Sequence, residues 1–400
     1  MNEIPNVEIR LGDCRDIIAT IPDCSIDSIV TDPPYELGFM GKKWDNSGIA
    51  YDVNLWTECL RVLKPGGHLL AFGGTRTYHR MTCAIEDAGF EIRDSIHWLY
   101  GSGFPKSHDV SKAIDKVAGA EREVTRRVVA GIAPGHGNYV NYNGPKPVVD
   151  VRDNPATDAA RQWEGWGTAL KPAHEPIVVA RKPRPGTVAA NVLEHGTGAL
   201  NIDGARVEHG GDIANSSGSG QGAGYEAHNH EGRIYGNGLG GIVAEPHAKG
   251  RWPANVITDG SIEAEWVRYF YCAKPSKAER NAVLDALPEG DRVFMGSSGR
   301  TFKDGEWVET HSEPIKRANF HPTVKPLALM RYLVRLVTPP GGTVLEPFAG
   351  SGTTLAAAIL EGFNSIGCEL TDDYLPIIQG RIAWAQQQIQ PDPESLFNNE

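Results

Sequence analysis

Short apolar runs alternate with amphipathic segments in two widely separated parts of this chain, residues 25–99 and 313–369. In the first part, a buried strand is predicted to end at Asp32, a helix over 52–67 to stop at Pro65-Gly66, and a second strand to cover 66–74. The pattern also predicts helices over 76–90, 327–337 and 353–362, and strands over 90–100, 174–182, 342–352 and 364–370. Such alternation predicts an α/β fold with a Rossmann-like, doubly wound mixed sheet.

Two segments break this rhythm and suggest the chain's organisation. Residues 107–169 combine a charged, helical run with a loop rich in Gly, Pro and Asn. Residues 183–312 are rich in glycine and contain too few apolar side chains to pack tightly. We therefore expect four parts: 1–182 with an insertion at about 107–169, then 183–312, 313–390, and a tail at 391–400.

Composition limits the classes of function. The formal charge of −11 disfavours a protein that coats polyanions indiscriminately, so any nucleic-acid contact would depend on local basic patches. The six cysteines are scattered without a C-x-x-C pair, and the histidines at 195, 209, 228, 230 and 247 lack ligand spacing, so we expect no metal. With no apolar run of membrane length and no signal peptide, a cytoplasmic protein is predicted.

The stretch TVLEPFAGSGTTLAAAIL, residues 343–360, predicts a strand, a tight turn with Gly350 and Gly352, and a helix. Glycines let a ligand approach the backbone, and the free amides at the helix start favour an anionic group. A phosphate loop would need Gly-Lys-Ser/Thr, and the dinucleotide fingerprint would need glycine where Leu355 stands. Glu369 follows Gly350 by 19 residues, about where an acid binds ribose hydroxyls. A nucleoside ligand without pyrophosphate is predicted, and S-adenosylmethionine fits; the alternative is plain turn chemistry.

The stretch DPPY, residues 32–35, holds a carboxylate rigidly at the end of the predicted strand. Each proline fixes its own φ and biases the preceding residue toward extended backbone, which leaves the Asp32 carboxylate and the Pro33 carbonyl as two stiff acceptors. Two acceptors suit an amino group with two hydrogens, and hydrogen bonds to both would direct the nitrogen lone pair at a sulfonium methyl group. Tyr35 offers a face on which a base can stack. Asp32, Pro33, Pro34 and Tyr35 are therefore the predicted catalytic residues.

Together these motifs resemble the amino-methylating DNA methyltransferases, in the permuted beta class that carries its catalytic half before its cofactor half. DPPY resembles the catalytic motif, EPFAGSGTT (346–354) the cofactor loop, HPTVKP (321–326) the segment before that loop, and LGDCRD (11–16) the piece whose acid contacts the cofactor adenine. The resemblance implies an S-adenosylmethionine-dependent methyltransferase fold in which 1–182 is the catalytic half, 183–312 the target-recognition region and 313–390 the cofactor half. The implied cofactor-binding residues are Asp13, Cys14, His321, Thr323, Lys325, Pro326, Glu346, Phe348, Ala349, Gly350, Ser351, Gly352, Thr353, Glu369 and Leu370.

The resemblance also implies double-stranded DNA as the partner, and a base inside a duplex must be flipped out at a cost of a few kcal/mol. The residues expected at the target base or on DNA are Lys42, Lys43, Trp44, Trp98, Phe104, His174, Arg181, Lys182, Arg184, Lys274, Lys277 and Arg280. Arg122, Arg126, Arg127 and Lys171 are further candidates for phosphate contacts. Core packing is the competing interpretation for Trp98, and a solvated surface charge is the competing one for each basic residue.

The predicted reaction is site-specific methylation of adenine N6 in DNA. The same acceptor pair would serve the cytosine amine, and Asp rather than Ser at position 32 favours adenine by resemblance only. A nucleotide-binding dehydrogenase would explain the alternating sheet and Glu369, but it would leave DPPY without a role. A non-catalytic DNA-binding module predicts no cofactor at all. Methylation of protein glutamine is disfavoured by Asp32 and by the order of the motifs. The sequence leaves the recognised site, a homodimer and a restriction partner open.

Overall fold

The computed structural model places its described residues in two compact units. It describes residues 4–37, 43–101, 103, 107–129, 148–208, 249–261, 267, 270–272, 299–303, 306–310, 321 and 323–389. The first unit takes in 1–102, 173–290 and 317–400, and the second takes in 103–172 and 291–316. This division differs from the expected one, because the segment 183–312 is shared between the two units.

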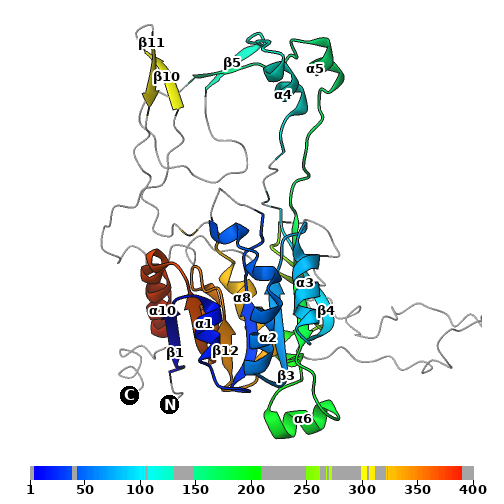
Figure 1. Cartoon of the computed structure of the whole chain (residues 1–400), viewed down its shortest axis with the longest axis vertical. Coiled ribbons are helices and arrows are strands. Elements are labelled where there is room, and N and C mark those ends of the chain that lie inside the picture. The colour runs from blue at the N-terminus through cyan, green and yellow to red at the C-terminus, as the bar shows by residue number, and fades with distance from the viewer. Residues whose placement is uncertain are drawn as a thin grey trace, which may run out of the picture. The chain divides into compact units, whose positions relative to one another are not determined.

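A nine-stranded mixed sheet forms the framework of the first unit (Figure 1). Its strands are β1 (Val7–Leu11), β2 (Ile26–Thr31), β3 (Leu63–Phe72), β4 (Glu91–Leu99), β7 (His174–Arg181), β8 (Val256–Thr258), β9 (Tyr271–Cys272), β12 (Thr343–Glu346) and β13 (Asn364–Glu369). They follow the order β1-β13-β12-β2-β3-β7-β4-β8-β9. β7 is antiparallel to both of its neighbours, and the other pairs are parallel. The predicted doubly wound mixed sheet is confirmed.

Helices cover both faces of this sheet, and Figure 1 shows α1 and α2 in front of it and α8 behind. The front layer is α1 (Cys14–Ala19), α2 (Val53–Val62) and α3 (Tyr78–Asp87), and the back layer is α8 (Leu327–Val337), α9 (Thr353–Leu360) and α10 (Leu375–Ile389). Alternation along β3 sends Leu69 and Ala71 into the front core and Leu70 and Phe72 into the back core. Both faces of the central strands are therefore apolar.

Shorter elements complete the first unit. They are the 3-10 helices η2 (Lys43–Asn46), η3 (Ile49–Tyr51), η4 (Asp203–Ala205) and η8 (Asp372–Tyr374), and the helix α6 (Val188–His195). One boundary differs from the prediction: α2 ends at Val62, and β3 already begins at Leu63, which pairs with Ile26. Pro65 accounts for this, because it biases Lys64 toward extended backbone and so ends the helix early. Among the described residues, none of the helices has the length and apolarity that a membrane crossing requires.

The neighbouring strands β2 and β12 define where a ligand can bind. The connection from β2 to β3 runs through α2 in front of the sheet, whereas the connection from β12 to β13 runs through α9 behind it. Open α/β sheets bind their ligands at such a switch point, beyond the carboxyl ends of the strands. Asp32 follows β2 there, and the glycine turn of residues 347–352 follows β12. The fold thus brings the two predicted motifs to one edge.

The second unit is built on a buried ion pair. It contains the helices α4 (Val110–Val117) and α5 (Asp158–Gln162) and the antiparallel pairs β5 (Arg126–Val129) with β6 (Val148–Val151) and β10 (Gly299–Lys303) with β11 (Glu306–Thr310). Arg122 Nε lies 2.6 Å from Asp115 Oδ2, and both side chains are buried. Asp115 also accepts hydrogen bonds from the amides of Ala156 and Thr157. Arg122 therefore links α4 to the segment before α5, a structural contact that occupies its guanidinium group.

Candidate active site

The Asp32 carboxylate lies beyond β2 with its two oxygens in different situations. Oδ2 accepts a hydrogen bond of 2.7 Å from Lys325 Nζ. Oδ1 is buried and has no hydrogen-bond partner among the residues that the structure describes. Burial raises the pKa of Asp32, and the neighbouring Lys325 ammonium opposes that rise. A buried carboxylate oxygen without a donor is costly, so Oδ1 is an acceptor prepared for a ligand.

Lys325 joins Asp32 to two further side chains. Its Nζ lies 3.0 Å from Tyr35 Oη and 3.2 Å from Glu175 Oε2, and Tyr35 Oη donates to Glu175 Oε2 at 2.8 Å. Burial by itself would lower the pKa of Lys325, but the carboxylates of Asp32 and Glu175 outweigh it, so the pKa is raised and the ammonium stays charged. Lys325, predicted to bind the cofactor, therefore lies in the catalytic cluster. Glu175 belongs to the same cluster and was not among the residues predicted from the sequence.

Strand alternation explains why Glu175 was missed in favour of His174. The Glu175 side chain lies on the back face of the sheet, on the same side as Ile177. The partly buried Tyr35 packs against that core and hydrogen-bonds to Glu175. His174 lies on the opposite face, where its ring contacts His97 with centroids 5.6 Å apart. Only the direction and register of β7 decide which of the two consecutive residues reaches Tyr35. The prediction that His174 lies at the target base is not met by this geometry.

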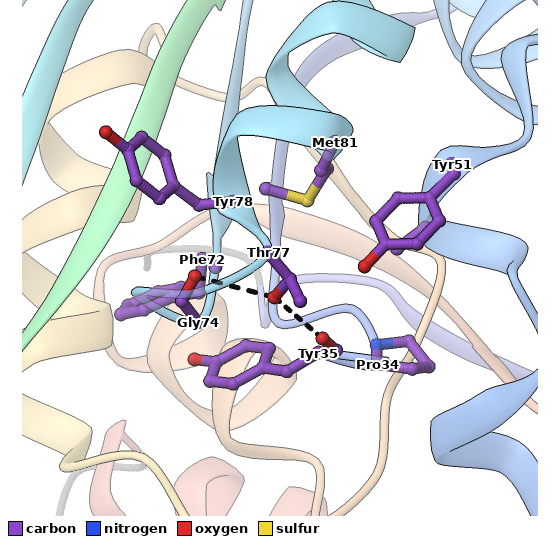
Figure 2. Close-up of a pocket in the computed structure, with 10 residues that line it drawn as sticks. Pro34, Tyr35, Tyr51, Phe72, Gly74, Thr77, Tyr78 and Met81 are labelled. Carbon is purple, nitrogen blue, oxygen red and sulfur yellow. Dashed lines mark hydrogen bonds between the residues drawn. The ribbon is translucent and has the colours of Figure 1, made fainter. Parts of the chain in front are cut away.

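The backbone of Tyr35 is held by α3 (Figure 2). Thr77 Oγ1 donates a 2.8 Å hydrogen bond to the Tyr35 carbonyl. The residues around this contact line a shallow hollow: Pro34, Tyr35, Ala50, Tyr51, Phe72, Gly73, Gly74, Thr77, Tyr78 and Met81. Glycine is required at position 73, because a Cβ there would lie 2.6 Å from Tyr78 Cβ. The turn after β3 therefore packs tightly against the catalytic segment and restrains it.

The glycine turn after β12 meets Glu369 at the end of β13. Gly350 N donates to Glu369 Oε2 at 2.7 Å, and Thr371 N donates to Oε1 at 2.8 Å. Gly350 and Gly352 have φ values of 53° and 72°, which side-chain-bearing residues rarely adopt. Burial raises the pKa of Glu369. Small residues and an acid thus surround one backbone turn, an arrangement that fits the ribose and amino-acid parts of a nucleoside ligand.

Glu346 connects the glycine turn to the catalytic strand. Its carboxyl group, 1% exposed, accepts hydrogen bonds from the Thr31 hydroxyl, from Phe348 N at 3.0 Å and from Thr354 Oγ1 at 2.5 Å. Burial raises the pKa of Glu346 to about 8. Both Glu346 oxygens accept hydrogen bonds from the chain's own donors, so Glu346 braces the glycine turn against β2.

The segment 321–326 touches both motifs. A Cβ on Gly350 would lie 2.9 Å from His321 Nε2, so this ring packs directly on the glycine turn. His321 Nδ1 lies 2.9 Å from the Thr323 carbonyl oxygen, and burial lowers the pKa of His321 to about 4. Pro326 then starts α8. Two residues four positions apart, His321 and Lys325, therefore contact the glycine turn and Asp32.

The segment after β1 lies at the same edge, because Gly12 N donates to the Glu369 carbonyl at 2.8 Å. Asp13 caps α1 by accepting from Arg15 N, and its ion pair with Arg15 lowers the pKa of Asp13. Cys14 is buried, and burial raises the pKa of its thiol to about 12, so it is unreactive. Leu370 follows Glu369 and is 63% exposed. The remaining predicted cofactor residues, Phe348, Ala349, Ser351 and Thr353, belong to the glycine turn and the start of α9.

Several predicted DNA contacts do not fit the structure. Arg181 is buried and pairs with Glu91 at 2.5 Å, and Lys182 Nζ donates to the Leu63 carbonyl at 2.7 Å. Both lie beside the N-terminal part of β3, at the edge of the sheet away from Asp32. Arg184, further along the chain, donates to the Gly186 carbonyl. Trp98 is 9% exposed in the back core, which confirms the core-packing alternative.

The structure leaves other predicted contacts undescribed. Lys42, Phe104, Lys274, Lys277 and Arg280 lie outside the described residues. Lys43 and Trp44 are described only as backbone, in η2. Arg126 and Arg127 in the second unit are exposed and pair with Asp153 and Asp150. Within the described residues, no group of His, Cys, Asp and Glu could hold a metal ion.

This chain is similar to known proteins in sequence and in structure. Among curated proteins, the type II methyltransferase M.HindIII of Haemophilus influenzae is 22% identical over 334 residues, covering 82% of this chain and 68% of that protein. M.MjaI of Methanocaldococcus jannaschii, also a type II methyltransferase, is 29% identical over 145 residues, covering 35% of this chain and 45% of that protein. Among solved structures, PvuII DNA methyltransferase (cytosine-N4-specific) gives a TM-score of 0.45 at 13% identity, covering 96% of this chain and 92% of that one.

A family model described as DNA methylase, for the N6/N4 methyltransferases, matches residues 26–380. That span includes Asp32, Lys325, the glycine turn and Glu369. The comparisons give no support to the dehydrogenase alternative. The chain belongs to the N6/N4 family of S-adenosylmethionine-dependent DNA methylases.

Proposed function

We propose that this protein methylates the exocyclic N6 amine of adenine in double-stranded DNA after the base is flipped out of the helix. The observation that carries the proposal is the buried, unpartnered Oδ1 of Asp32, at the switch point of the sheet and on the same edge as the glycine turn. Aspartate at position 32, by resemblance to the family's catalytic motif, favours adenine over cytosine.

The catalytic residues would act mainly by positioning. Asp32 Oδ1 and the Pro33 carbonyl accept the two hydrogens of the target amine, which directs its lone pair away from them. The Tyr35 ring offers a stacking face worth about 1–3 kcal/mol, part of which offsets the cost of flipping. Asp32 must be ionised to offer an acceptor on both oxygens and to take the proton that the methylated nitrogen releases. Burial and the Lys325 ion pair set the pH at which it does so.

The residues that would hold S-adenosylmethionine surround the glycine turn. Bound there, it supplies an electrophilic methyl group on a sulfonium ion. Glu369 would accept hydrogen bonds from the ribose hydroxyls while still holding Gly350 N, because each carboxylate oxygen can accept more than one donor. His321 and the free amides at the start of α9 would contact the amino-acid end. Asp13 is the candidate for the adenine, from the segment after β1.

We also assign target recognition to the second unit, together with the expected region 183–312. The exposed side chains of Arg126 and Arg127 are suited to phosphate contacts there, although each pairs with an aspartate of the same unit. The relatives M.HindIII and M.MjaI are type II methyltransferases, which supports DNA as the proposed substrate.

The test is methylation of defined duplexes with labelled S-adenosylmethionine, followed by digestion and identification of the modified nucleoside. N6-methyladenine at one sequence context is the expected product. If the product is N4-methylcytosine, the target base is cytosine instead of adenine, and the rest of the proposal is unchanged. No label transfer to a wide set of duplexes, from protein that binds S-adenosylmethionine by calorimetry, would contradict DNA as the substrate.

A further inference from the structure

Lys325 is buried in a cluster of charged and aromatic side chains around Asp32. Its side chain is 9% exposed, and its Nζ contacts Asp32 Oδ2, Glu175 Oε2 and Tyr35 Oη within 3.2 Å. The same nitrogen lies 4.9 Å from the centre of the Phe72 ring, on the side of the sheet where that ring packs. Two carboxylates and an aromatic face thus fix one ammonium ion, with strong attraction in a buried environment.

The contact with Lys325 involves one oxygen of the Asp32 carboxylate and not the other. The ammonium ion holds Oδ2, and Oδ1 remains buried without a donor. If Lys325 were absent, the carboxylate would lose its charged partner, and the neutral Tyr35 hydroxyl, a weaker donor, would be left to orient it. The position of the lysine therefore makes the carboxylate one directed acceptor.

The same contact sets the charge of Asp32. Five titratable groups surround this carboxylate: Lys325 before α8, Glu175 on β7, Tyr35 after DPP, Glu346 at the end of β12, and Tyr100 after β4 beside Glu175. Lys325 is the cation among them, and the carboxylate of Glu175 works against ionisation of Asp32. Without the lysine, burial and Glu175 would both favour the protonated acid, which cannot take up the proton released by the methylated amine.

We propose that Lys325 is a positioning residue for Asp32, which keeps the carboxylate ionised and leaves Oδ1 for the target amine, and this inference rests on the proposed methyl transfer. It replaces the expectation that Lys325 binds the cofactor. It also means that the segment 321–326 serves both halves of the site, with His321 on the glycine turn and Lys325 on the catalytic carboxylate.

The experiment compares three variants of the full chain with the wild type. Lys325→Met keeps most of the length of the side chain and removes its charge, and Lys325→Arg keeps the charge. Lys64→Met is the matched control, because Lys64 forms a similar ion pair, 2.6 Å from Asp27 Oδ1, at the opposite end of β2. Single-turnover methyl transfer is measured from pH 5 to 9 on a duplex that the wild type methylates, and S-adenosylmethionine affinity is measured by calorimetry.

The expected result is a shift of the acid limb of the pH profile. In Lys325→Met the limb moves to higher pH by about 1–3 units, because an opposite charge lowers a carboxyl pKa by that amount. Lys325→Arg recovers most of the rate at low pH, Lys64→Met follows the wild type, and S-adenosylmethionine affinity stays within about threefold throughout. An unmoved limb in Lys325→Met would overturn the proposal, and an unmoved limb with cofactor affinity lost would restore the role that the sequence predicted.

A second measurement needs no activity. Melting temperatures of Lys325→Met, Asp32→Asn and the double variant test whether the two side chains are coupled. Lys325→Met should lower the melting temperature by leaving buried carboxylates unpaired, and adding Asp32→Asn should recover part of that loss. Additive losses would overturn the proposal even if the protein folds poorly. If the wild type methylates no duplex while this coupling is present, the failure lies with the proposed function and not with the Lys325–Asp32 pair.

Discussion

Thr31, the last residue of β2, donates its hydroxyl hydrogen bond to Glu346, the last residue of β12. The next residue after Thr31 is Asp32, and the glycine turn follows Glu346. Both side chains are buried. One hydrogen bond between neighbouring parallel strands therefore fixes Asp32, the proposed catalytic residue, relative to the glycine turn.

Replacing Glu346 by Gln should reduce the dependence of stability on pH. Burial raises the pKa of Glu346 to about 8 from its ordinary value of 4.5, so between those pH values the folded state holds a proton that the unfolded state has released. The free energy of unfolding therefore falls as pH rises through this window, by at most about 1.4 kcal/mol per pH unit from this group. Glu346→Gln should remove that slope while keeping the hydrogen bonds. Urea unfolding at several pH values between 5 and 8 measures it, and equal slopes in the two proteins would contradict the prediction.

Replacing Asp32 by Asn should remove methyl transfer and spare the cofactor. The amide has the same shape but no charge, and one of its two positions donates instead of accepting. We expect the single-turnover rate to fall by about a thousandfold or more, in line with the loss of a transition-state electrostatic contact. S-adenosylmethionine affinity by calorimetry should hardly change. Asp27→Asn, at the other end of β2, is the control; a rate close to the wild type in Asp32→Asn would mean that this carboxylate is not the acceptor.

Replacing Glu369 by Ala should weaken S-adenosylmethionine binding. The substitution removes the proposed ribose contact and also the acceptor of Gly350 N, which orders the turn. Hydrogen bonds to a charged group contribute about 1.5–3 kcal/mol, so we expect a loss of affinity of about 10- to 100-fold in calorimetry. Glu361→Gln is the matched control, because Glu361 is a buried carboxylate that pairs with Arg331 and Arg335 on the back helices. Equal affinities for Glu369→Ala and the wild type would remove the ribose assignment.

Replacing Thr77 by Val should slow methyl transfer without changing cofactor affinity. The substitution keeps the shape of the side chain but removes the donor to the Tyr35 carbonyl in the hollow of Figure 2. A part-buried carbonyl that loses its donor costs about 1–3 kcal/mol, and part of that loss should appear as a rate decrease of about 3- to 10-fold. Thr82→Val is the control, because Thr82 lies on α3, just beyond Thr77, and its Oγ1 donates to the Tyr78 carbonyl and not to Tyr35. A Thr77→Val rate equal to that of Thr82→Val would show that Tyr35 needs no support from α3.

The correct expectations depended on local patterns. The period of apolar residues predicted the strands and helices, and the residues after two strands predicted that Asp32 and the glycine turn lie at carboxyl ends. Because parallel strands present their carboxyl ends at one edge, no further information was needed to bring these motifs together. The Glu369 contact with Gly350 follows from the same rule, since β13 lies next to β12.

The sequence by itself therefore determined the class of fold and the placement of Asp32 and the glycine turn at one edge of the sheet. The tertiary structure decided which side chains complete the site. Lys325 lies 293 positions from Asp32 in sequence, and its ammonium reaches that carboxylate only because β12 is placed beside β2. Glu175, and not His174, contacts Tyr35, and Arg181 is buried against Glu91, because β7 pairs antiparallel with β3 and β4 in one particular register. Strand order and register depend on packing among residues far apart in the chain, so a local pattern contains no record of them.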